Sequence, residues 1–185
     1  RAAAFAMGRA MDDVIIAAAT GTAYTGETGA TTESAQTAIA ASVGSTTGLN
    51  IPKIAKAKQL LDVADVDPSI ARHIIVSPEQ INNLLNVTEV TSADFNTVKA
   101  LVHGEIDTFL GFKFTVSNRL AKSGNDRTII AYAEDGIALA VGKDISARID
   151  ERADKSYATQ VYYCQTIGAT RMEQAKVVPI TCTEA

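Results

Sequence analysis

The stretch that most constrains the fold is residues 103–120, which reads HGEIDTFLGFKFTVSNRL. After Gly111, the apolar side chains of Phe112, Phe114 and Val116 alternate with polar ones. This two-residue period predicts a strand with one buried face, because successive side chains point to opposite sides of a sheet. Burying each such side chain contributes roughly 1.5–3 kcal/mol, so we expect the strand to lie against the main core. The stretch has no pattern of a nucleophile or metal ligand, and we interpret it as architectural.

The composition is that of a globular protein without a basic surface for nucleic acid. The 185 residues suffice for one domain or two small lobes, and 46% are hydrophobic and 21% charged. The net charge is -4 and the cationic residues are scattered, which disfavours DNA binding, although such a wall can still enclose DNA. Cys164 and Cys182 are too few for a disulfide scaffold or a zinc site, so we expect two free thiols.

The N-terminal part of the chain is rich in small residues. Arg1 already lies inside an Ala-rich helical pattern, so we expect a fragment or processed product that lacks an N-terminal part. Residues 1–19 predict a helix suited to close packing. Residues 20–48 are mostly Ala, Gly, Ser and Thr, and two interpretations stay open: a flexible linker, or an ordered loop with one short strand around 37–43. Without a membrane-spanning run or a signal peptide, we expect a soluble intracellular protein with no membrane partner.

A second helix is predicted where the composition changes. Asn50 can cap its first turn, and the helix is expected to end near Asp65. We interpret Lys53, Lys56 and Lys58 as its solvated face.

A buried strand and two more helices are expected next. Residues 73–76 form a short apolar run bounded by turn residues, as in a central strand. Ser77 can cap the following helix, with Gln80 three positions later at the spacing of a capping box. A further helix is predicted over residues 92–104, with Gly104 as its stop.

The C-terminal third predicts strands. Residues 127–132 and 137–141 flank a four-residue loop, which favours a β-hairpin. Residues 143–155 alternate and then become strongly charged, as expected of an edge strand that leaves the first lobe. Residues 157–167 and 175–182 are predicted to form a closing antiparallel pair.

The sequence offers no catalytic motif. It lacks a GxSxG elbow, a Walker loop, a dinucleotide fingerprint and an HExxH motif. His73 and His103 belong to no recognisable motif, and we interpret both as structural. The aspartates between 62 and 67 match a calcium loop only superficially, because Pro68 interrupts them. We therefore predict that the protein is not an enzyme, and we assign no catalytic, cofactor-binding or metal-ligating residue and no cofactor.

Several stretches together resemble the major capsid protein of tailed bacteriophages, which has the Hong Kong phage capsid fold. The resemblance covers nearly the whole chain and rests on the order and spacing of its pieces. These are the helix ending at residues 12–16 (DDVII), the helix 54–61, the strand-to-helix step IIVSPEQINNLL at 74–85, the stretch 104–120, and the segment 149–180. The resemblance implies an α+β fold class, with an axial domain of mixed sheet plus helices and part of a peripheral domain.

The resemblance also implies domain limits. Residues 1–49 would be peripheral, comprising the end of the spine helix and the Ala/Gly/Thr-rich segment. Residues 50–145 would form the axial domain, and residues 146–185 the return strands of the peripheral sheet. The N-terminal arm and extended loop of such proteins would precede Arg1. The covalent lysine–asparagine crosslinking of some relatives has no assignable residues here.

The implied function is structural. Many copies would tile hexamers and pentamers of an icosahedral shell around phage double-stranded DNA, assembled in the bacterial host cytoplasm, with scaffolding, portal or decoration proteins as further partners. Loops near 86–94 and 121–126 would face neighbours or the capsomer axis, and residues 20–48 would become ordered on contact. The alternatives are the shell subunit of an encapsulin-type nanocompartment, and an unrelated α+β enzyme or binding module that uses His73 or His103.

Overall fold

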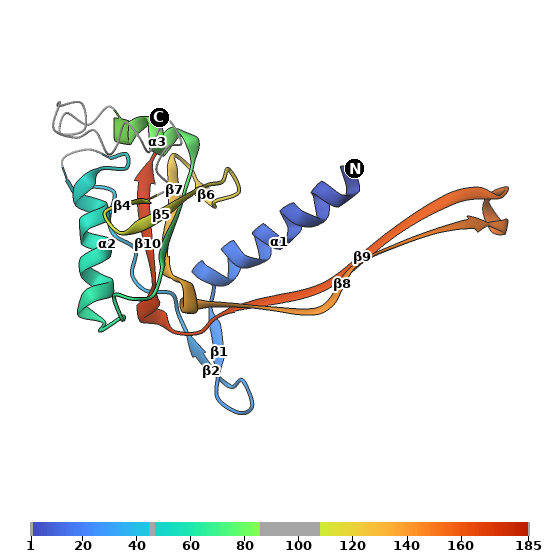
Figure 1. Cartoon of the computed structure of the whole chain (residues 1–185), viewed down its shortest axis with the longest axis horizontal. Coiled ribbons are helices and arrows are strands. Elements are labelled where there is room, and N and C mark those ends of the chain that lie inside the picture. Colours follow the sequence, from blue (N-terminus) through green and yellow to red (C-terminus); the bar gives the residue numbers. More distant parts are fainter. Residues whose placement is uncertain (1, 45–46, 86–107, 185) are drawn as a thin grey trace.

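The computed structural model describes residues 2–44, 47–85 and 108–184, and shows a body from which a long two-stranded ribbon extends (Figure 1). Three helices lie in these ranges: α1 (Ala2–Thr20), α2 (Ile51–Val63) and α3 (Pro78–Leu85). The predicted helices at 1–19, after Asn50 and after Ser77 are therefore confirmed. The predicted helix at 92–104, the loop 86–94 and His103 lie outside the described residues.

A mixed sheet forms the centre of the body. Its strands are β3 (Arg72–Val76), β4 (Thr108–Phe109), β5 (Phe112–Val116), β6 (Lys122–Ser123), β7 (Asp126–Ala133) and β10 (Val177–Thr183). The strand order is β10-β7-β3-β5-β4, with β6 paired to β7. β3 pairs with β5 in parallel and with β7 antiparallel, and most of its residues are buried, which confirms the predicted central strand. The core lies between this sheet and α2, which runs along the body in Figure 1.

β5 confirms the predicted strand, but its burial is graded. Phe112 is fully buried, Phe114 is half-buried, and Val116 is 53% exposed. Among the described strands, β4 pairs only with Phe112 and Lys113, so the later residues of β5 lie at the edge of the described sheet. The expectation of a uniformly buried face is wrong, because Val116 at this edge is exposed.

The first turn of α2 confirms the cap and corrects the expectation for Lys53. The Asn50 side chain accepts a hydrogen bond from the Lys53 backbone N–H at 3.0 Å. Lys53 is fully buried, and its Nζ donates to the carbonyl oxygens of Thr47 at 2.8 Å and Gly48 at 2.6 Å. Lys53 is one helical turn before buried Ala57, so it shares the inward face of α2. Only Lys56 and Lys58 fit the predicted solvated face.

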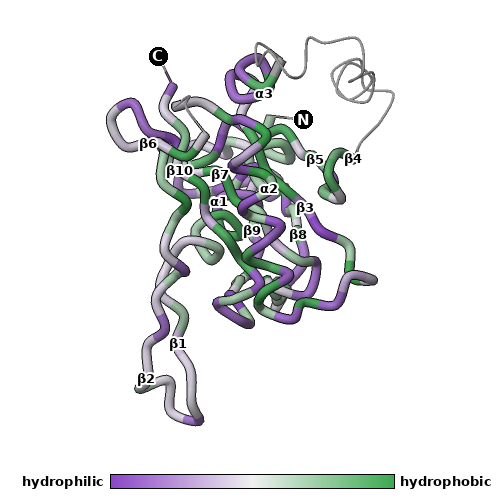
Figure 2. The backbone as a smooth tube through the Cα atoms, turned by 90° about the vertical axis from the view of Figure 1, so that its left-hand side faces the viewer, coloured by the Kyte–Doolittle hydropathy of each residue, from purple (hydrophilic) through white to green (hydrophobic). Residues whose placement is uncertain are grey.

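Most of the segment 20–48 is ordered and protects a sheet edge. β1 (Ala23–Thr25) and β2 (Thr31–Glu33) form a hairpin that projects from the body (Figure 2). The strand expected around 37–43 is reduced to a single bridge, in which Ile39 bonds to both sides of Ile180: its N–H donates to the Pro179 carbonyl and its carbonyl accepts from the Thr181 N–H, each at 2.9 Å. These bonds cover the outer edge of β10, where an unpaired strand would expose its backbone groups. The linker interpretation is therefore wrong for the described part of this segment.

The predicted hairpin of 127–132 with 137–141 is wrong. β7 pairs with β3 and β10, whereas β8 (Ile137–Arg152) pairs with β9 (Ala158–Arg171) and leaves the body. The connection is a short 3-10 turn, η1 (Glu134–Gly136), at which the chain passes from the body to the ribbon. Both sides of β7 are already occupied by strands distant in sequence, so β8 cannot fold back on it.

The predicted closing pair of 157–167 with 175–182 is also wrong. These residues lie in β9 and β10, which belong to different sheets. The strand expected over 143–155 does leave the body, and β8 continues to Arg152 with β9 as its partner.

The domain limits 1–49, 50–145 and 146–185 stay a prediction. β8 crosses the limit at 145, and β10 joins the sheet that contains β3, β5 and β7. Val177–Thr183 therefore lies apart from the return strands with which the resemblance groups it.

Replacing Phe112 by Ala should lower the free energy of unfolding by about 3–5 kcal/mol, because the fully buried ring would leave a cavity. Val116→Ala is the matched control in the same strand, with an expected loss below about 1 kcal/mol because Val116 is exposed. Urea unfolding followed by circular dichroism measures both variants. An equal decrease in the free energy of unfolding for both variants would contradict the burial of Phe112 in the core.

Candidate assembly surface

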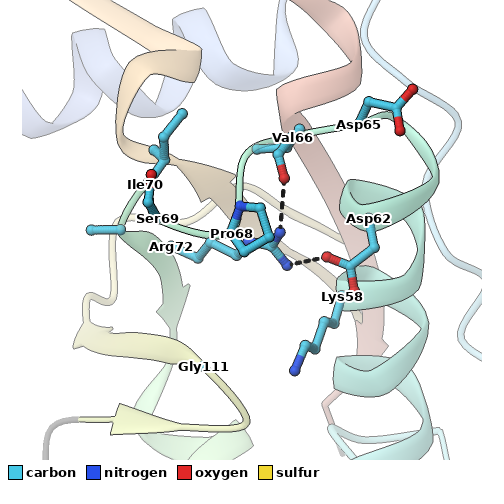
Figure 3. A pocket seen from close by; sticks show the side chains of 10 residues that line it. Lys58, Asp62, Asp65, Val66, Pro68, Ser69, Ile70, Arg72 and Gly111 are labelled. Carbon is cyan, nitrogen blue, oxygen red and sulfur yellow. Dashed lines mark hydrogen bonds and ion pairs between the residues drawn. The ribbon is translucent and has the colours of Figure 1, made fainter.

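A hollow of about 620 Å³ lies beside the C-terminal end of α2 (Figure 3). Arg72 reaches from β3 under the loop that follows α2, where its Nη1 pairs with Asp62 at 2.7 Å and its Nη2 donates to the Val66 carbonyl at 3.2 Å. The residues that line the hollow include no histidine or cysteine. The contacts of Arg72 with Asp62 and with the Val66 carbonyl hold the loop between α2 and β3 in place. We therefore interpret this arrangement as structural.

His73 lies in a packing contact. It is paired with Tyr132 across β3 and β7, and the two rings stack with centroids 5.4 Å apart and an interplanar angle of 22°. The assignment of His73 as structural stays a prediction that this contact supports. In the ranges that the structure describes, no group of three His, Cys, Asp or Glu could hold a metal ion.

The ribbon formed by β8 and β9 carries several large exposed apolar side chains. Ile149 is 70% exposed and Val161 is 53% exposed, and the two face each other in the β8–β9 register, so they share one face. Val141, Ile145 and Tyr157 are also exposed on the ribbon. A two-stranded hairpin is marginally stable alone, and exposed apolar groups of this kind mark interaction surfaces. The ribbon is therefore the candidate assembly surface.

Helix α1 packs on the ribbon, but little of it is buried. Ile16 and Ala19 are its buried residues, whereas Phe5 near its start is 69% exposed. Asp13 forms a bidentate ion pair with Arg119, which follows β5, and the hydrogen bond from Arg119 lowers the pKa of Asp13. Both partners are exposed, so this pair orients α1 while contributing little stability.

Arg171 joins the ribbon, α1 and the β1–β2 hairpin. Its side chain is buried at the body end of β9. Nη1 donates to the carbonyl oxygens of Ala19 at 3.2 Å and Gly21 at 2.8 Å, and Nη2 donates to that of Glu33 at 2.9 Å. A cation is favourable at the carbonyl end of a helix, where the last oxygens lack intrahelical donors. The sequence analysis gave Arg171 no role, so it missed this one.

Glu184 forms a buried network of hydrogen bonds and ion pairs in the body, at the end of β10 that is far from Arg171. It is 1% exposed, and its Oε1 accepts from Ser77 Oγ at 2.6 Å and from Gln80 Nε2 at 3.3 Å. The same oxygen pairs with Arg127 Nε at 2.7 Å, and Oε2 pairs with Lys122 Nζ at 3.3 Å. Burial alone would raise the pKa of Glu184, but the hydrogen bonds of Ser77, Arg127, Gln80 and Lys122 together hold it at about 2.

These bonds connect α3, β6 and β7 to the segment that follows β10. The Ser77 cap is itself confirmed, since its Oγ accepts from the Gln80 N–H at 3.4 Å. The loop 121–126 contains β6 and lies beside this network. The expectation that this loop faces a neighbouring subunit stays a prediction. Sequence reasoning missed Glu184, and the one available signal was a carboxyl residue at the end of an apolar strand.

The comparisons with known proteins agree with this architecture. A family model described as Phage capsid protein matches residues 1–184. No curated protein matches the sequence at a significant level. No helix in the described part of the chain is long and apolar enough to cross a membrane.

Several solved structures share the fold. One from Mycobacterium phage Che8 has a TM-score of 0.65 and 22% identity, covering 97% of this chain and 61% of that chain. The capsid of Ralstonia phage GP4 has a TM-score of 0.66 and 12% identity, covering 97% and 64%. The head structure of Helicobacter pylori bacteriophage KHP40 has a TM-score of 0.64 and 12% identity, covering 96% and 66%. The chain thus spans less than two thirds of each of these relatives, and the predicted α+β fold class is confirmed.

Replacing Glu184 by Gln should flatten the pH dependence of stability. The folded-state pKa of about 2 lies below the ordinary value of 4.5, so the carboxylate stabilises the fold above about pH 4.5 and loses this contribution as the pH falls toward 2. The full shift corresponds to about 3 kcal/mol. Denaturant unfolding between pH 7 and pH 2 should show the variant less stable at pH 7 and similar to the original chain near pH 2.

The matched control is Glu27→Gln, which removes an exposed carboxylate at the tip of the β1–β2 hairpin. It should follow the pH profile of the original chain. A constant gap between Glu184→Gln and the original chain down to pH 2 would contradict the assignment of Glu184 as an ionised, buried carboxylate.

Proposed function

Since the chain belongs to the phage capsid protein family, we propose that it assembles into hexamers and pentamers of an icosahedral shell around phage double-stranded DNA. The resemblance expected from the order of its sequence pieces is confirmed, and the chain is a phage capsid subunit. The observation that carries the proposal is the ribbon, a projecting surface with exposed apolar side chains and open strand edges.

The ribbon has the properties that a contact between copies needs. Among the strands that the structure describes, β8 and β9 pair only with each other, so each keeps one edge that no other described strand covers. Ile149 and Val161 add apolar area on one face. When a surface on one copy binds a different surface on the next copy, repetition gives a closed ring if the rotation between copies closes after a whole number of copies. A projecting ribbon that binds the body or ribbon of its neighbour would build such rings.

Buried contacts hold the base of the ribbon and the loops of the body. Arg171 holds the ribbon base to α1 and β2, and the Glu184 network and the Arg72–Asp62 pair hold the loops of the body. We propose that these contacts together hold the angle at which the ribbon leaves the body. A fixed angle is what sets the curvature of a closed shell.

The enclosed DNA needs no specific contact. With a net charge of -4 and scattered cations, the chain lacks the basic stripe that drives binding to phosphates. Scaffolding, portal or decoration proteins would be further partners, the host cytoplasm the place of assembly, and the virion the final location. The β1–β2 hairpin and the loop 121–126 are additional surfaces for neighbouring subunits.

Electron microscopy of the full-length product, purified from infected or induced cells, tests the proposal. Uniform icosahedral shells that contain DNA are expected. A small monodisperse species under all conditions would contradict assembly, and shells filled with a protein cargo would point to a nanocompartment instead.

Replacing Ile149 and Val161 by Asp in the full-length protein should leave the subunit folded and prevent assembly. Both side chains are exposed in the single chain, but burying their charges in a contact would cost more than about 1.4 kcal/mol and raise the subunit concentration needed for assembly at least tenfold. Light scattering measures assembly and circular dichroism checks folding. The control is Val63→Asp, at a 73% exposed valine on α2, which should assemble normally. Unchanged assembly of the ribbon variant would rule out the ribbon as the contact.

A further inference from the structure

The β1–β2 hairpin is a second projecting element, and its charge is entirely negative. Among the described strands, β1 and β2 pair only with each other, over three residue pairs. A hairpin of this size is marginally stable on its own, so we expect it to gain stability from a partner. Tyr24 is 71% exposed on it. No Lys or Arg occurs between Arg9 and Lys53, so the charges of the hairpin are those of Glu27 and Glu33.

Glu27 lies at the tip of the hairpin, in a tight turn. The Gly29 N–H donates to the Gly26 carbonyl at 3.2 Å, and the two glycines have φ angles of 67° and 85°. Glycine adopts such angles without steric cost, so the turn presents Glu27 in a defined position. The Glu27 side chain is exposed, and among the described residues it forms no ion pair. Its carboxylate is therefore available to a cation on another molecule.

The polar face of the ribbon carries the complementary charge. A hollow of about 380 Å³ there has Lys143, Arg148 and Asp150 of β8 and Tyr162 of β9 in its lining. Arg148 is opposite Tyr162 in the β8–β9 register, so this face is opposite to the one that carries Ile149. Within the described ranges, neither Lys143 nor Arg148 is in an ion pair. The two cations outnumber the single carboxylate, so the hollow is positive.

The hairpin and the ribbon leave the body at one junction but in different directions (Figure 1). Arg171, at the base of β9, donates hydrogen bonds to the carbonyls of Gly21 and Glu33, at the two ends of the hairpin. The hairpin of a chain therefore points away from the polar face of its own ribbon, and a contact between the two requires two copies.

We propose that the β1–β2 hairpin of one copy docks on the polar face of the β8–β9 ribbon of a second copy, with Glu27 against Lys143 and Arg148. This inference rests on the proposed shell assembly and names one of its contacts. Complementary charges select which surfaces meet, and Tyr24 and Tyr162 add aromatic area of the kind enriched in interfaces. Hairpin and ribbon are different surfaces, so the contact can close a ring. The apolar face of the ribbon stays free for another neighbour.

Charge reversal in the full-length protein tests the proposal. Glu27→Lys should raise the subunit concentration needed for assembly by about three- to tenfold, because like charges then meet. Adding Arg148→Glu should restore assembly. Adding Lys56→Glu instead, at an exposed lysine of α2, gives the same net charge and should not restore it. Light scattering measures assembly, and circular dichroism checks that each variant is folded.

Arg148→Glu alone should weaken assembly to the same extent, which keeps the test decisive if Glu27→Lys does not fold. Unchanged assembly of the folded single variants, or equal rescue by Lys56→Glu, would overturn this contact while shells of the original chain still form. A full-length original chain that forms no shells would contradict the proposed function itself.

Crosslinking identifies the two surfaces directly. Cys164 lies on the polar face opposite Ser146 and is half-buried, whereas Cys182 is buried. In shells of Glu27→Cys, a short bismaleimide should link the introduced thiol to Cys164 of another copy, and Cys164→Ser should abolish the link. Glu79→Cys, on α3, is the control that should give no link to Cys164. Denaturing gels separate links between copies from links within a chain; finding only the latter, or no link to Cys164, would contradict the proposal.

Discussion

The arrangement of the molecule depends most on the buried guanidinium of Arg171. Three carbonyl oxygens, from Ala19, Gly21 and Glu33, accept its hydrogen bonds where α1, the β1–β2 hairpin and β9 meet. A hydrogen bond from a charged donor contributes about 1.5–3 kcal/mol, and the loss of the donor would leave three carbonyls at this junction without it. One buried side chain therefore links the base of the ribbon to α1 and to the β1–β2 hairpin. A link at this point matters for a shell subunit, because an error at the base of a long ribbon grows toward its tip.

The body and the ribbon are built for different tasks. The body buries its apolar strands on α2 and closes its loops with paired charges, at Glu184 with Arg127 and at Arg72 with Asp62. The ribbon exposes apolar residues, and within the described ranges it has neither a third strand nor a core of its own. A projecting element with these properties gains its stability from neighbours. This division matches a function of geometry, in which the body carries a projecting contact surface.

Local features of this fold were predictable from the sequence, and pairing partners were not. Asn50 and Ser77 marked helix starts because a cap acts within three residues. The chain turn at Ala133–Gly136 fits a hairpin equally well, and only β3 and β10, which are distant in sequence, decide that β8 leaves the body. Lys53 was expected in solvent because a charge is costly to bury, but the carbonyls of Thr47 and Gly48 compensate it. The irregularity of β8 between Lys143 and Ser146 has no local signature, since it depends on the register between two strands.

The central claim is that the β8–β9 ribbon becomes buried between copies while the body keeps its structure. Hydrogen exchange with mass spectrometry, comparing free subunits with assembled particles of the full-length protein, tests it most directly. Amides of Ile137–Arg152 and Ala158–Arg171 should exchange much more slowly in the particle, whereas those of Arg72–Val76 and Val177–Thr183 should be protected equally in both states. Equal exchange of the ribbon in free subunits and in particles would contradict the account.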